Sequence, residues 1–444
     1  MTFTGVLLGI YFSELYFPTS EIRPFSRFLN FLKLSWLIPL PYALLNFYSY
    51  LRFPIFTPPR DEPYRLFSHT LYFRYVTRGN NPSVIAESAA LTYQILSKAL
   101  PKQRWVIEIV TDEKLNIAAE YLTIITVPKG YLPPNGSKYK ARALHYANQI
   151  SKAGPKDWII HLDEETQLCR ETARAIANFV AEEQKRSIKD AAYKPAIGQG
   201  AIIYGARHVE NWITTLADSL RVGDDFGRFR LQFEYGKAWF GMHGSFIVIN
   251  SDVEKQVGLD NGVQASITED AWFALAAQKL GYRFKFIQAQ MYEKSPFNLM
   301  DFAKQRQRWF TGLWLCVAGK TLRPIDRAIL GTFMLMWSFS WLCLLMVYLN
   351  FIYPTGTPVW LSLAGSISFI YYVTLYMLGF LKTFKRQKGI FNTLKWAFLL
   401  LAQILLIPLF SLMEAMGICL SIFKPDMGFY IVKKEFRSLN SPAV

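Results

Sequence analysis

The chain has 444 residues, of which 52% are hydrophobic, 16% aromatic and 18% charged, a balance typical of a membrane protein with a soluble part. Its net charge of +16 fits either nucleic acid or an anionic membrane surface, and because no zinc-finger or RNA-binding signature accompanies the charge, we exclude nucleic acid and favour the membrane. The four cysteines show no CxxC spacing and no pairing pattern, which predicts a reducing compartment and argues against a disulfide scaffold or a zinc site.

Residues 1–57 are predicted to be an N-terminal membrane segment. Residues 3–17 are apolar but short, and they fit a first membrane helix or an interfacial segment. A cleaved signal peptide is disfavoured, since no basic start and no small-residue cleavage site are present. Residues 34–50 are apolar and nearly reach the roughly 20 residues that span a bilayer. A linker follows, with prolines at Pro54, Pro58 and Pro59.

Residues 61–320 form the predicted soluble domain, in which strand-like and helix-like segments alternate. This alternation predicts an α/β fold with a mostly parallel sheet that is covered by helices on both faces. Helices are expected at 83–99, 138–152 and 171–186, and strands at 71–77, 105–111, 122–127, 158–162, 201–205, 245–250 and 284–288.

Residues 326–424 are predicted to return to the membrane. Two long apolar runs, 328–352 and 359–381, are joined by an uncharged turn and predict a transmembrane hairpin. Basic residues within Lys382–Lys388 follow the second run, and positive charge beside a span marks the cytosolic side. The soluble domain is therefore expected in the cytosol.

The last apolar stretch, 394–423, is broken by Pro408 and Glu414 and is too short for two spans. A single pass would put the basic tail, 425–444, outside the cytosol, against the charge rule. A kinked re-entrant or interfacial segment fits better, and the number of spans stays open. We expect a multi-pass integral membrane protein of the endoplasmic reticulum or Golgi in a eukaryotic cell, and of the plasma membrane otherwise.

The apolar run Trp158–Leu162 ends abruptly in Asp163, Glu164 and Glu165. Ligands of α/β sheets bind at the carboxyl ends of strands, so these acids are expected at a ligand site. If the chain stays extended, Asp163 and Glu165 point the same way. Two hard oxygen ligands suit Mg²⁺ or Mn²⁺, which often bridge to phosphates. The alternative is an ordinary acidic turn.

A second strand, Trp105–Thr111, ends in Asp112. If it neighbours the strand at 158–162, both carboxylates reach the same edge of the sheet. An acidic turn without function is again the alternative.

A third acidic site, Ser266–Asp270, precedes an apolar helical pattern that stops at Gly281. Ser266 and Glu269 have capping-box spacing, and Gly281 fits the residue after the helix. The functional reading makes Asp270 a general base for a hydroxyl nucleophile. The structural alternative is that acids simply favour the first turn of a helix.

The stretch Gln305–Trp309 reads QRQRW and lies on a helix expected to begin near Asn298. Positions 305, 308 and 309 share one helical face. Arg308 could bind a diphosphate through two hydrogen bonds, and Trp309 could stack on a sugar ring. A basic-aromatic helix at the membrane interface is the competing interpretation.

The order of these motifs resembles the membrane-integrated glycosyltransferase family 2, which includes cellulose, chitin and hyaluronan synthases. That family carries D, DxD, (T/E)ED and Q(Q/R)xRW on a GT-A fold, a Rossmann-like nucleotide-diphospho-sugar transferase fold. Thr268–Asp270 and Gln305–Trp309 match as they stand, whereas Glu165 replaces the usual second aspartate.

A closer resemblance covers most of the chain and is to the egghead-type β-1,4-mannosyltransferases, in which DEE replaces DxD. It implies transfer of mannose from GDP-mannose to glucosylceramide. The segments that carry this resemblance are Val76–Gly79, Lys140–Leu144, His161–Thr166, Trp212–Asp218, Tyr292–Phe297 and Phe429–Lys434.

The resemblance also implies roles for individual residues. The reaction inverts the anomeric centre, with Asp270 taking the proton of the acceptor hydroxyl. Glu165, with Asp163, is expected to hold Mn²⁺ or Mg²⁺. The expected nucleotide-sugar contacts are Thr77, Asp112, Lys140, Asp163 and Arg308, and the expected acceptor contacts are Glu269, Gln305 and Trp309.

Two alternatives remain at this point. A processive polysaccharide synthase using a UDP-sugar has the same motifs, but the C-terminal membrane part is small for a pore that threads a polymer. A non-catalytic nucleotide-sugar-binding membrane protein or a transporter is disfavoured, because transporters carry polar residues at mid-membrane and only Glu414 is charged within a predicted span.

Overall fold

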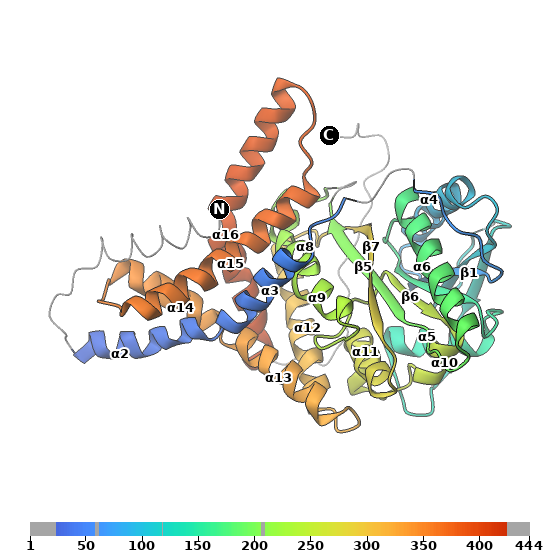
Figure 1. The fold of residues 1–444 in the computed structure, drawn as a ribbon, viewed down its shortest axis with the longest axis horizontal. Helices are drawn as coiled ribbons and strands as arrows, with labels where there is room; N and C mark the ends of the chain where they lie inside the picture. Colours follow the sequence, from blue (N-terminus) through green and yellow to red (C-terminus); the bar gives the residue numbers. More distant parts are fainter. Residues whose placement is uncertain (1–23, 58–61, 118, 206–208, 424–444) are drawn as a thin grey trace.

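The computed structural model describes residues 24–57, 62–117, 119–205 and 209–423. The predicted apolar segment 3–17 and the basic tail lie outside these ranges. Figure 1 shows the sheet and its covering helices at one end of the molecule, with long helices extending from the other end.

A seven-stranded mixed sheet forms the core of the described chain, in the order β3-β2-β1-β4-β6-β5-β7. β1 pairs in parallel with β2 and β4, and β5 pairs in parallel with β7, which confirms the prediction of a mostly parallel sheet. Every predicted strand is present, but β6 runs antiparallel to both β4 and β5, which was not predicted. The strands are β1 Leu71–Thr77, β2 Trp105–Thr111, β3 Leu122–Thr126, β4 Trp158–Asp163, β5 Ile197–Tyr204, β6 Ile247–Asn250 and β7 Phe284–Glu293.

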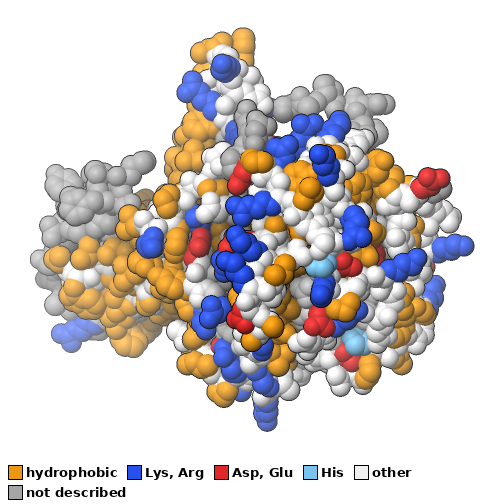
Figure 2. All heavy atoms as spheres, turned by 45° about the vertical axis from the view of Figure 1, so that its right-hand side comes forward, with side chains coloured by type: hydrophobic (Ala, Val, Ile, Leu, Met, Phe, Trp, Pro, Cys, Tyr) orange, Lys and Arg blue, Asp and Glu red, His pale blue; other side chains and the backbone are white. Residues whose placement is uncertain are grey.

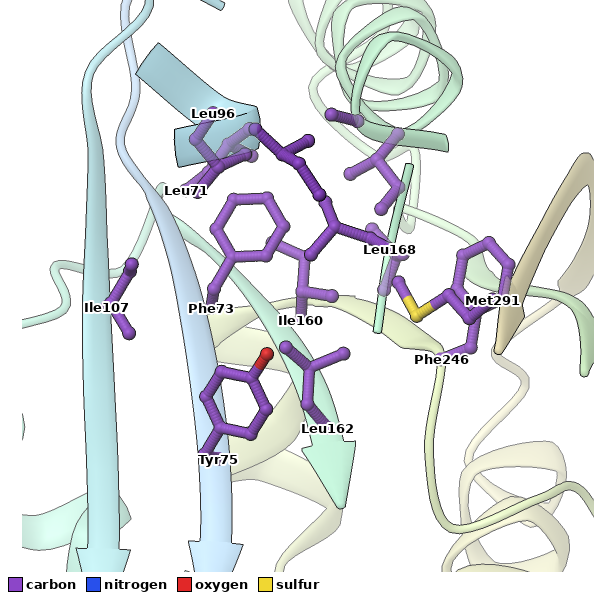
Figure 3. Packing of buried hydrophobic residues seen from close by; sticks show 14 of the residues in the cluster. Leu71, Phe73, Tyr75, Leu96, Ile107, Ile160, Leu162, Leu168, Phe246 and Met291 are labelled. Atoms are coloured by element: carbon purple, nitrogen blue, oxygen red, sulfur yellow. The ribbon is translucent and has the colours of Figure 1, made fainter. Parts of the chain in front are cut away.

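Helices cover both faces of this sheet, and the alternation of side chains along β1 shows why. Leu71, Phe73 and Tyr75 point into one apolar cluster, while Tyr72 belongs to the cluster on the opposite face. Figure 3 shows the first cluster, in which Phe73 contacts its neighbours with no exposed surface. Burial of such a side chain stabilises the fold by roughly 1.5–3 kcal/mol. The first face is covered by α4 (Pro82–Ala99) and α6 (Arg170–Lys189), and the second by α5 (Tyr139–Ile150), α9 (Arg230–Glu234), α10 (Ser251–Val257) and α11 (Glu269–Lys279).

Because β6 is antiparallel to both its neighbours, the carboxyl ends of β1, β2, β4, β5 and β7 all lie at one edge of the sheet. This edge is where an α/β sheet binds its ligand. The predicted meeting of the acidic strand ends at one edge is therefore present.

Four helical stretches in the described ranges are long and apolar enough to cross a membrane: Arg27–Arg52, Pro324–Ile352, Val359–Thr383 and Ile390–Phe423. The second and third coincide with the predicted hairpin. The first consists of α2 (Pro24–Leu32), η1 (Lys33–Leu37) and α3 (Leu40–Arg52), and the others of α13 (Pro324–Ser338), α14 (Ser340–Ile352), α15 (Val359–Thr383) and α16 (Ile390–Phe423).

α16 is one continuous helix although it contains Pro408, so the proline does not divide it into two segments. Figure 1 shows it running crosswise to α14 and α15. Phe398 and Leu405 are exposed, while Gln403 and Glu414 are buried against the rest of the chain. An apolar outer face of this kind suits contact with lipid, and interfacial placement of this helix remains a prediction.

The apolar helices pack directly on the sheet domain. A Cβ atom at Gly379 of α15 would lie 1.8 Å from the carbonyl oxygen of Ser219, and one at Gly223 would lie 2.2 Å from that of Leu375. Only glycine permits α15 and α8 (Ser219–Asp224) to approach so closely. The sheet domain and the apolar helices therefore share one packed interface in the described chain.

Candidate active site

A cavity of about 1850 Å³ opens at the carboxyl edge of the sheet. Its wall continues from the strand ends into the apolar helices. All ten residues predicted to form the site line this cavity: Thr77, Asp112, Lys140, Asp163, Glu165, Glu269, Asp270, Gln305, Arg308 and Trp309.

Asp112 follows β2, and Asp163 is the last residue of β4. The sequence predicted that these two strands are neighbours, but β1 lies between them. Asp112 Oδ1 lies 2.5 Å from Nη2 of Arg142, a residue of α5 that the sequence did not single out as functional. Arg142 carries one positive charge to the edge where a nucleotide would be expected.

Lys140 lies in the first turn of α5 and connects the acidic groups of the cavity. Its Nζ is 2.5 Å from Asp163 Oδ1, 2.7 Å from the carbonyl oxygen of Gly244 and 3.7 Å from Glu269 Oε1. Burial lowers the pKa of Lys140, but the charges of Asp163 and Glu269 outweigh burial and raise the pKa overall. Lys140 is therefore a permanent cation at the centre of the site.

The turn after β4 changes the expected position of Glu165. β4 ends at Asp163, and the backbone N–H of Thr166 donates to the carbonyl of Asp163 at 3.0 Å, which closes a turn. Alternation along a strand therefore does not reach Glu165, and that part of the prediction is wrong. Glu165 nevertheless lines the same cavity as Asp163.

Glu164, between these two acids, has a structural role at the strand end. Its carboxylate accepts hydrogen bonds from Thr77 Oγ1 at 2.6 Å and from Asn81 Nδ2 at 3.1 Å. Thr77 is thus fixed to the acidic turn, which holds the ends of β1 and β4 together.

The donor set fits a divalent ion that phosphate oxygens help to bind. In the described ranges, no three His, Cys, Asp or Glu side chains come together as a closed metal site. Mg²⁺ commonly binds through one or two carboxylates plus substrate phosphates. Asp163 and Glu165 line the cavity, and the Asp163 side chain is 38% exposed there. Two carboxylates beside open space match this kind of site.

α11 begins at Glu269, but not through the predicted capping box. Thr268 precedes the helix and its side chain makes no capping hydrogen bond. Ser266 Oγ instead accepts from the Lys138 N–H at 2.9 Å and donates to the Gly262 carbonyl at 2.8 Å. Ser266, in η3 (Gln264–Ser266) just before α11, is thus occupied by a contact with the start of α5, so the capping-box prediction is wrong. Gly281 has φ of +84° after the helix, as predicted.

Glu269 and Asp270 form a coupled acidic pair. Burial and then the charge of Asp270 raise the pKa of Glu269 to about 7, against the opposing effect of Lys140. Burial also raises the pKa of Asp270, which is partly exposed to the cavity. Near neutral pH such a pair holds part of a proton between its two groups. Raised carboxylate pKa values in a cleft are a mark of a catalytic base.

α12 (Leu299–Ala318) begins as predicted, with Asn298 Oδ1 accepting the Asp301 N–H at 2.8 Å. Gln305, Arg308 and Trp309 all face the cavity from this helix. Arg308 lies in the field of Glu269, Asp270 and Asp163, whose charges oppose the lowering of its pKa by burial. The helix therefore adds a second cation to the acidic centre.

Trp309 is already in contact with two guanidinium groups. Arg221 Cζ lies 4.0 Å and Arg306 Cζ lies 4.5 Å from the centroid of the indole ring. These contacts are cation–π interactions. Stacking of Trp309 on a sugar therefore remains a prediction.

Arg306, the second position of the Q(Q/R)xRW motif, is a structural residue to which the sequence analysis assigned no role. It is buried, with Nε 2.6 Å from Glu414 Oε1 and Nη2 2.7 Å from Asp218 Oδ1. A Cβ atom at Gly417 would lie 2.7 Å from Arg306 Cβ, so α16 lies directly on α12. The partners are 88 and 108 residues away in sequence, beyond any local signal.

The cavity then extends between the apolar helices. Trp337 of α13, Val347 of α14 and Phe369 of α15 line it, as does Asn350 near the end of α14. The same cavity therefore joins the acidic strand ends to a space between helices that are apolar enough to span a membrane.

The chain is similar to several known proteins. A family model described as "Glycosyl transferase family group 2" matches residues 158–384. The β-1,4-mannosyltransferase bre-3 of Caenorhabditis elegans is 34% identical over 418 residues, which cover 93% of this chain and 89% of that protein. The β-1,4-mannosyltransferase egh of Drosophila melanogaster is 33% identical over 421 residues, with the same two coverages. Among solved structures, the mannosyltransferase PcManGT of Pyrobaculum calidifontis, in complex with GDP-Man and Mn²⁺, covers 90% of this chain and 100% of its own at 12% identity and a TM-score of 0.47.

Proposed function

From the chain's membership of glycosyl transferase family group 2, and within it of the egghead-type β-1,4-mannosyltransferases, we propose a specific reaction. The protein transfers mannose from GDP-mannose to a membrane glycolipid such as glucosylceramide. The chain is a glycosyltransferase, and its α/β domain belongs to the GT-A class that the motifs predicted. The proposal adds the donor, the acceptor and the roles of individual residues.

The continuity of the cavity is the observation that supports a lipid acceptor. One end holds the acidic strand ends, where a nucleotide-sugar is expected, and the other end lies between α13, α14 and α15. A glycolipid has a sugar head group and a hydrocarbon tail, so it can place its hydroxyl at the first end while its tail stays among apolar helices. A soluble acceptor has no hydrocarbon tail that could bind in the apolar part of the cavity.

We assign the acceptor's deprotonation to Asp270. Its carboxylate is partly exposed to the cavity, and its Oδ1 accepts the N–H of Ala271 at 2.8 Å, which fixes the orientation of the side chain. The hydroxyl oxygen attacks the anomeric carbon, its proton passes to Asp270, and the bond from that carbon to the diphosphate breaks. Inversion at the anomeric carbon follows from this single displacement.

The departing diphosphate is stabilised by cations that the fold provides. Lys140 and Arg308 lie at the acidic centre, and Arg142 lies at the edge near Asp112. Fixed positive groups where negative charge develops lower the barrier. Asp163 and Glu165 would hold Mn²⁺ or Mg²⁺, which would neutralise charge on the diphosphate when bound. Thr77 supports the donor side through Glu164, while Glu269, Gln305 and Trp309 face the acceptor.

We place the catalytic domain on the cytosolic side of an intracellular membrane. Lys385, Arg386 and Lys388 are exposed between α15 and α16, at the end of α15 that packs against the sheet domain. Positive residues beside a span favour the cytosolic side. The turn between α14 and α15 would then face the opposite side.

A donor panel tests this function directly. The full-length protein in detergent or nanodiscs is incubated with radiolabelled GDP-mannose, UDP-glucose or UDP-N-acetylglucosamine and with glucosylceramide. The proposal predicts label from GDP-mannose in the lipid fraction, one sugar per acceptor. Label in a polymer ladder, or from a UDP-sugar alone, would contradict it.

A further inference from the structure

A second polar cluster lies in the cavity wall, away from the strand ends. Asp224, at the end of α8, and Arg228, in the kinked segment η2 (Asp225–Phe229), form an ion pair with Nη2 2.5 Å from Oδ2. Both side chains line the cavity and are only 12–14% exposed. Tyr42, from α3, lines the same region, and the Arg228 guanidinium lies 5.2 Å from its ring centroid.

This cluster is connected to the proposed base through a short chain of contacts. Asp225, next to Asp224, accepts a hydrogen bond from His243 Nε2 at 2.5 Å. His243 precedes Gly244, where a Cβ atom would lie 3.1 Å from Asp270 Oδ2. The polar cluster thus lines the same cavity as Asp270, so a sugar head group bound in this cavity would lie beside both.

The charges of the cluster favour a neutral ligand. Asp224 and Arg228 cancel each other, so the pair offers hydrogen-bond donors and acceptors without a net field. Rings surround it: Arg228 Cζ is 4.2 Å from the ring centroid of Phe333 and 5.4 Å from that of Phe240. Alternating hydroxyls and C–H faces, as in a hexose, match a wall of this kind better than a phosphate does.

The cluster also retains unused hydrogen-bonding capacity. Asp224 Oδ1 and Arg228 Nη1 are buried and have no hydrogen-bond partner in the part of the chain that the structure describes, and the Tyr42 hydroxyl interacts with the Arg228 guanidinium. Buried polar atoms are almost always paired, so two such atoms in one ion pair need an explanation. A bound polyhydroxyl group would supply the missing partners.

We propose that Asp224, Arg228 and Tyr42 bind the hydroxyl groups of the acceptor sugar and so select which glycolipid is extended. This proposal rests on the function given above, because it takes the acceptor to be a neutral hexose on a lipid. It places sugar recognition on α3, α8 and η2, outside the motifs that identify the family.

Tyr42→Phe and Asp224→Asn test the proposal in the full-length protein. The acceptor is dodecyl β-glucoside, and the kinetic constants for the acceptor and for GDP-mannose are measured separately. The loss of a neutral hydrogen bond predicts a fall of about 2–10-fold in acceptor kcat/KM for Tyr42→Phe, and the loss of a charged one about 10–100-fold for Asp224→Asn. The KM for GDP-mannose should stay within about twofold, since the donor binds at the strand ends.

Tyr48→Phe is the matched control, on the same helix as Tyr42. The Tyr48 hydroxyl is exposed and lies 2.6 Å from that of Tyr235, outside the cavity lining. This variant should keep the wild-type acceptor constants. Because the Arg228 guanidinium is the main partner of the Tyr42 hydroxyl among the described residues, Tyr42→Phe should change the melting temperature little.

The outcomes separate the two proposals. If the wild-type protein glycosylates no glucoside or glucolipid, the proposed function fails. If it does so and both variants keep the wild-type acceptor kcat/KM, the sugar-binding cluster is wrong. Competition of inorganic phosphate or of anionic vesicles with the glucoside, stronger in Asp224→Asn because Arg228 then lacks its counter-charge, would also overturn it in favour of an anion site.

Discussion

The two ends of the cavity are built from different kinds of contact. At the strand ends, Asp112 pairs with Arg142 and Asp163 pairs with Lys140, and the two carboxylate side chains are 26% and 38% exposed. Near the apolar helices, Arg306 and its partner Asp218 are at most 1% exposed. The two strand-end pairs are accessible to water and would be accessible to a ligand, whereas the Arg306–Asp218 pair is buried.

This difference separates residues that bind from residues that hold the fold together. A partly exposed ion pair contributes about 0–1 kcal/mol to stability, because water screens it. Removal of one partner from a buried pair costs about 3–5 kcal/mol, since a charge is left without compensation. We therefore expect the strand-end pairs to matter for turnover and the Arg306 cluster to matter for folding.

The largest expected effect is on stability, in Arg306→Met. The change leaves Asp218 and Glu414 buried without their cation and should cost about 3–5 kcal/mol. The measurement is thermal or denaturant unfolding of the protein in detergent. Arg142→Met, at the strand ends, should cost no more than about 1 kcal/mol while it weakens donor binding. Equal destabilisation by the two changes would erase the distinction between the two ends.

Removal of the divalent metal should reduce transfer and donor binding, which depend on the strand ends, without lowering the stability of the fold. Chelation is expected to reduce transfer by at least about 10²-fold and to weaken donor binding, because the diphosphate would lose a counter-ion beside Asp163 and Glu165. Mn²⁺ or Mg²⁺ should restore both. The melting temperature without a nucleotide should hardly change. Full transfer in the presence of chelator would remove the metal from these carboxylates.

A smaller effect is expected in the pH profile. A base acts when it is ionised, so burial, which raises the pKa of Asp270, means that transfer falls as pH drops at a pH above the ordinary range of an aspartate. Glu269 repels the charge of Asp270, and Glu269→Gln should therefore move this acid limb to lower pH. The check is kcat/KM between about pH 5 and pH 8. A shift of the limb to higher pH would show that the two acids do not interact as described.

Much of the site at the strand ends could be predicted from the sequence, because its parts are local. Apolar runs such as Trp158–Leu162 define strands, and the residue that follows each run lies at the edge where ligands bind. The Asn298 cap and the Gly281 stop are also local signals, and both are present. The α/β class followed from the same patterns.

The contacts around the apolar part of the cavity could not be predicted, because they join distant parts of the chain. Arg228 N–H donates to Asn46 Oδ1 at 2.9 Å across 182 residues, and Arg306 meets Glu414 only once α16 lies on α12. The hydrophobic periodicity of a sequence does not indicate such long-range pairs. The capping box failed for a related reason: Ser266 has the right spacing, but a tertiary contact with the Lys138 N–H takes its side chain. β6 likewise reads as any other strand, since direction is not encoded in its four residues.

The central claim, that Asp270 is the base of a glycosyl transfer, is tested most directly by Asp270→Asn. This change keeps size and hydrogen bonding but loses basicity, so transfer should fall by about 10²–10⁴-fold while GDP-mannose binding, measured by calorimetry, stays nearly unchanged. Glu165→Gln is the matched variant, and it should lose metal-dependent donor binding instead. If Asp270 only supports the first turn of α11, the asparagine variant would lose about 0.3–1 kcal/mol of stability and keep its turnover. Normal turnover in a well-folded Asp270→Asn protein would contradict the account.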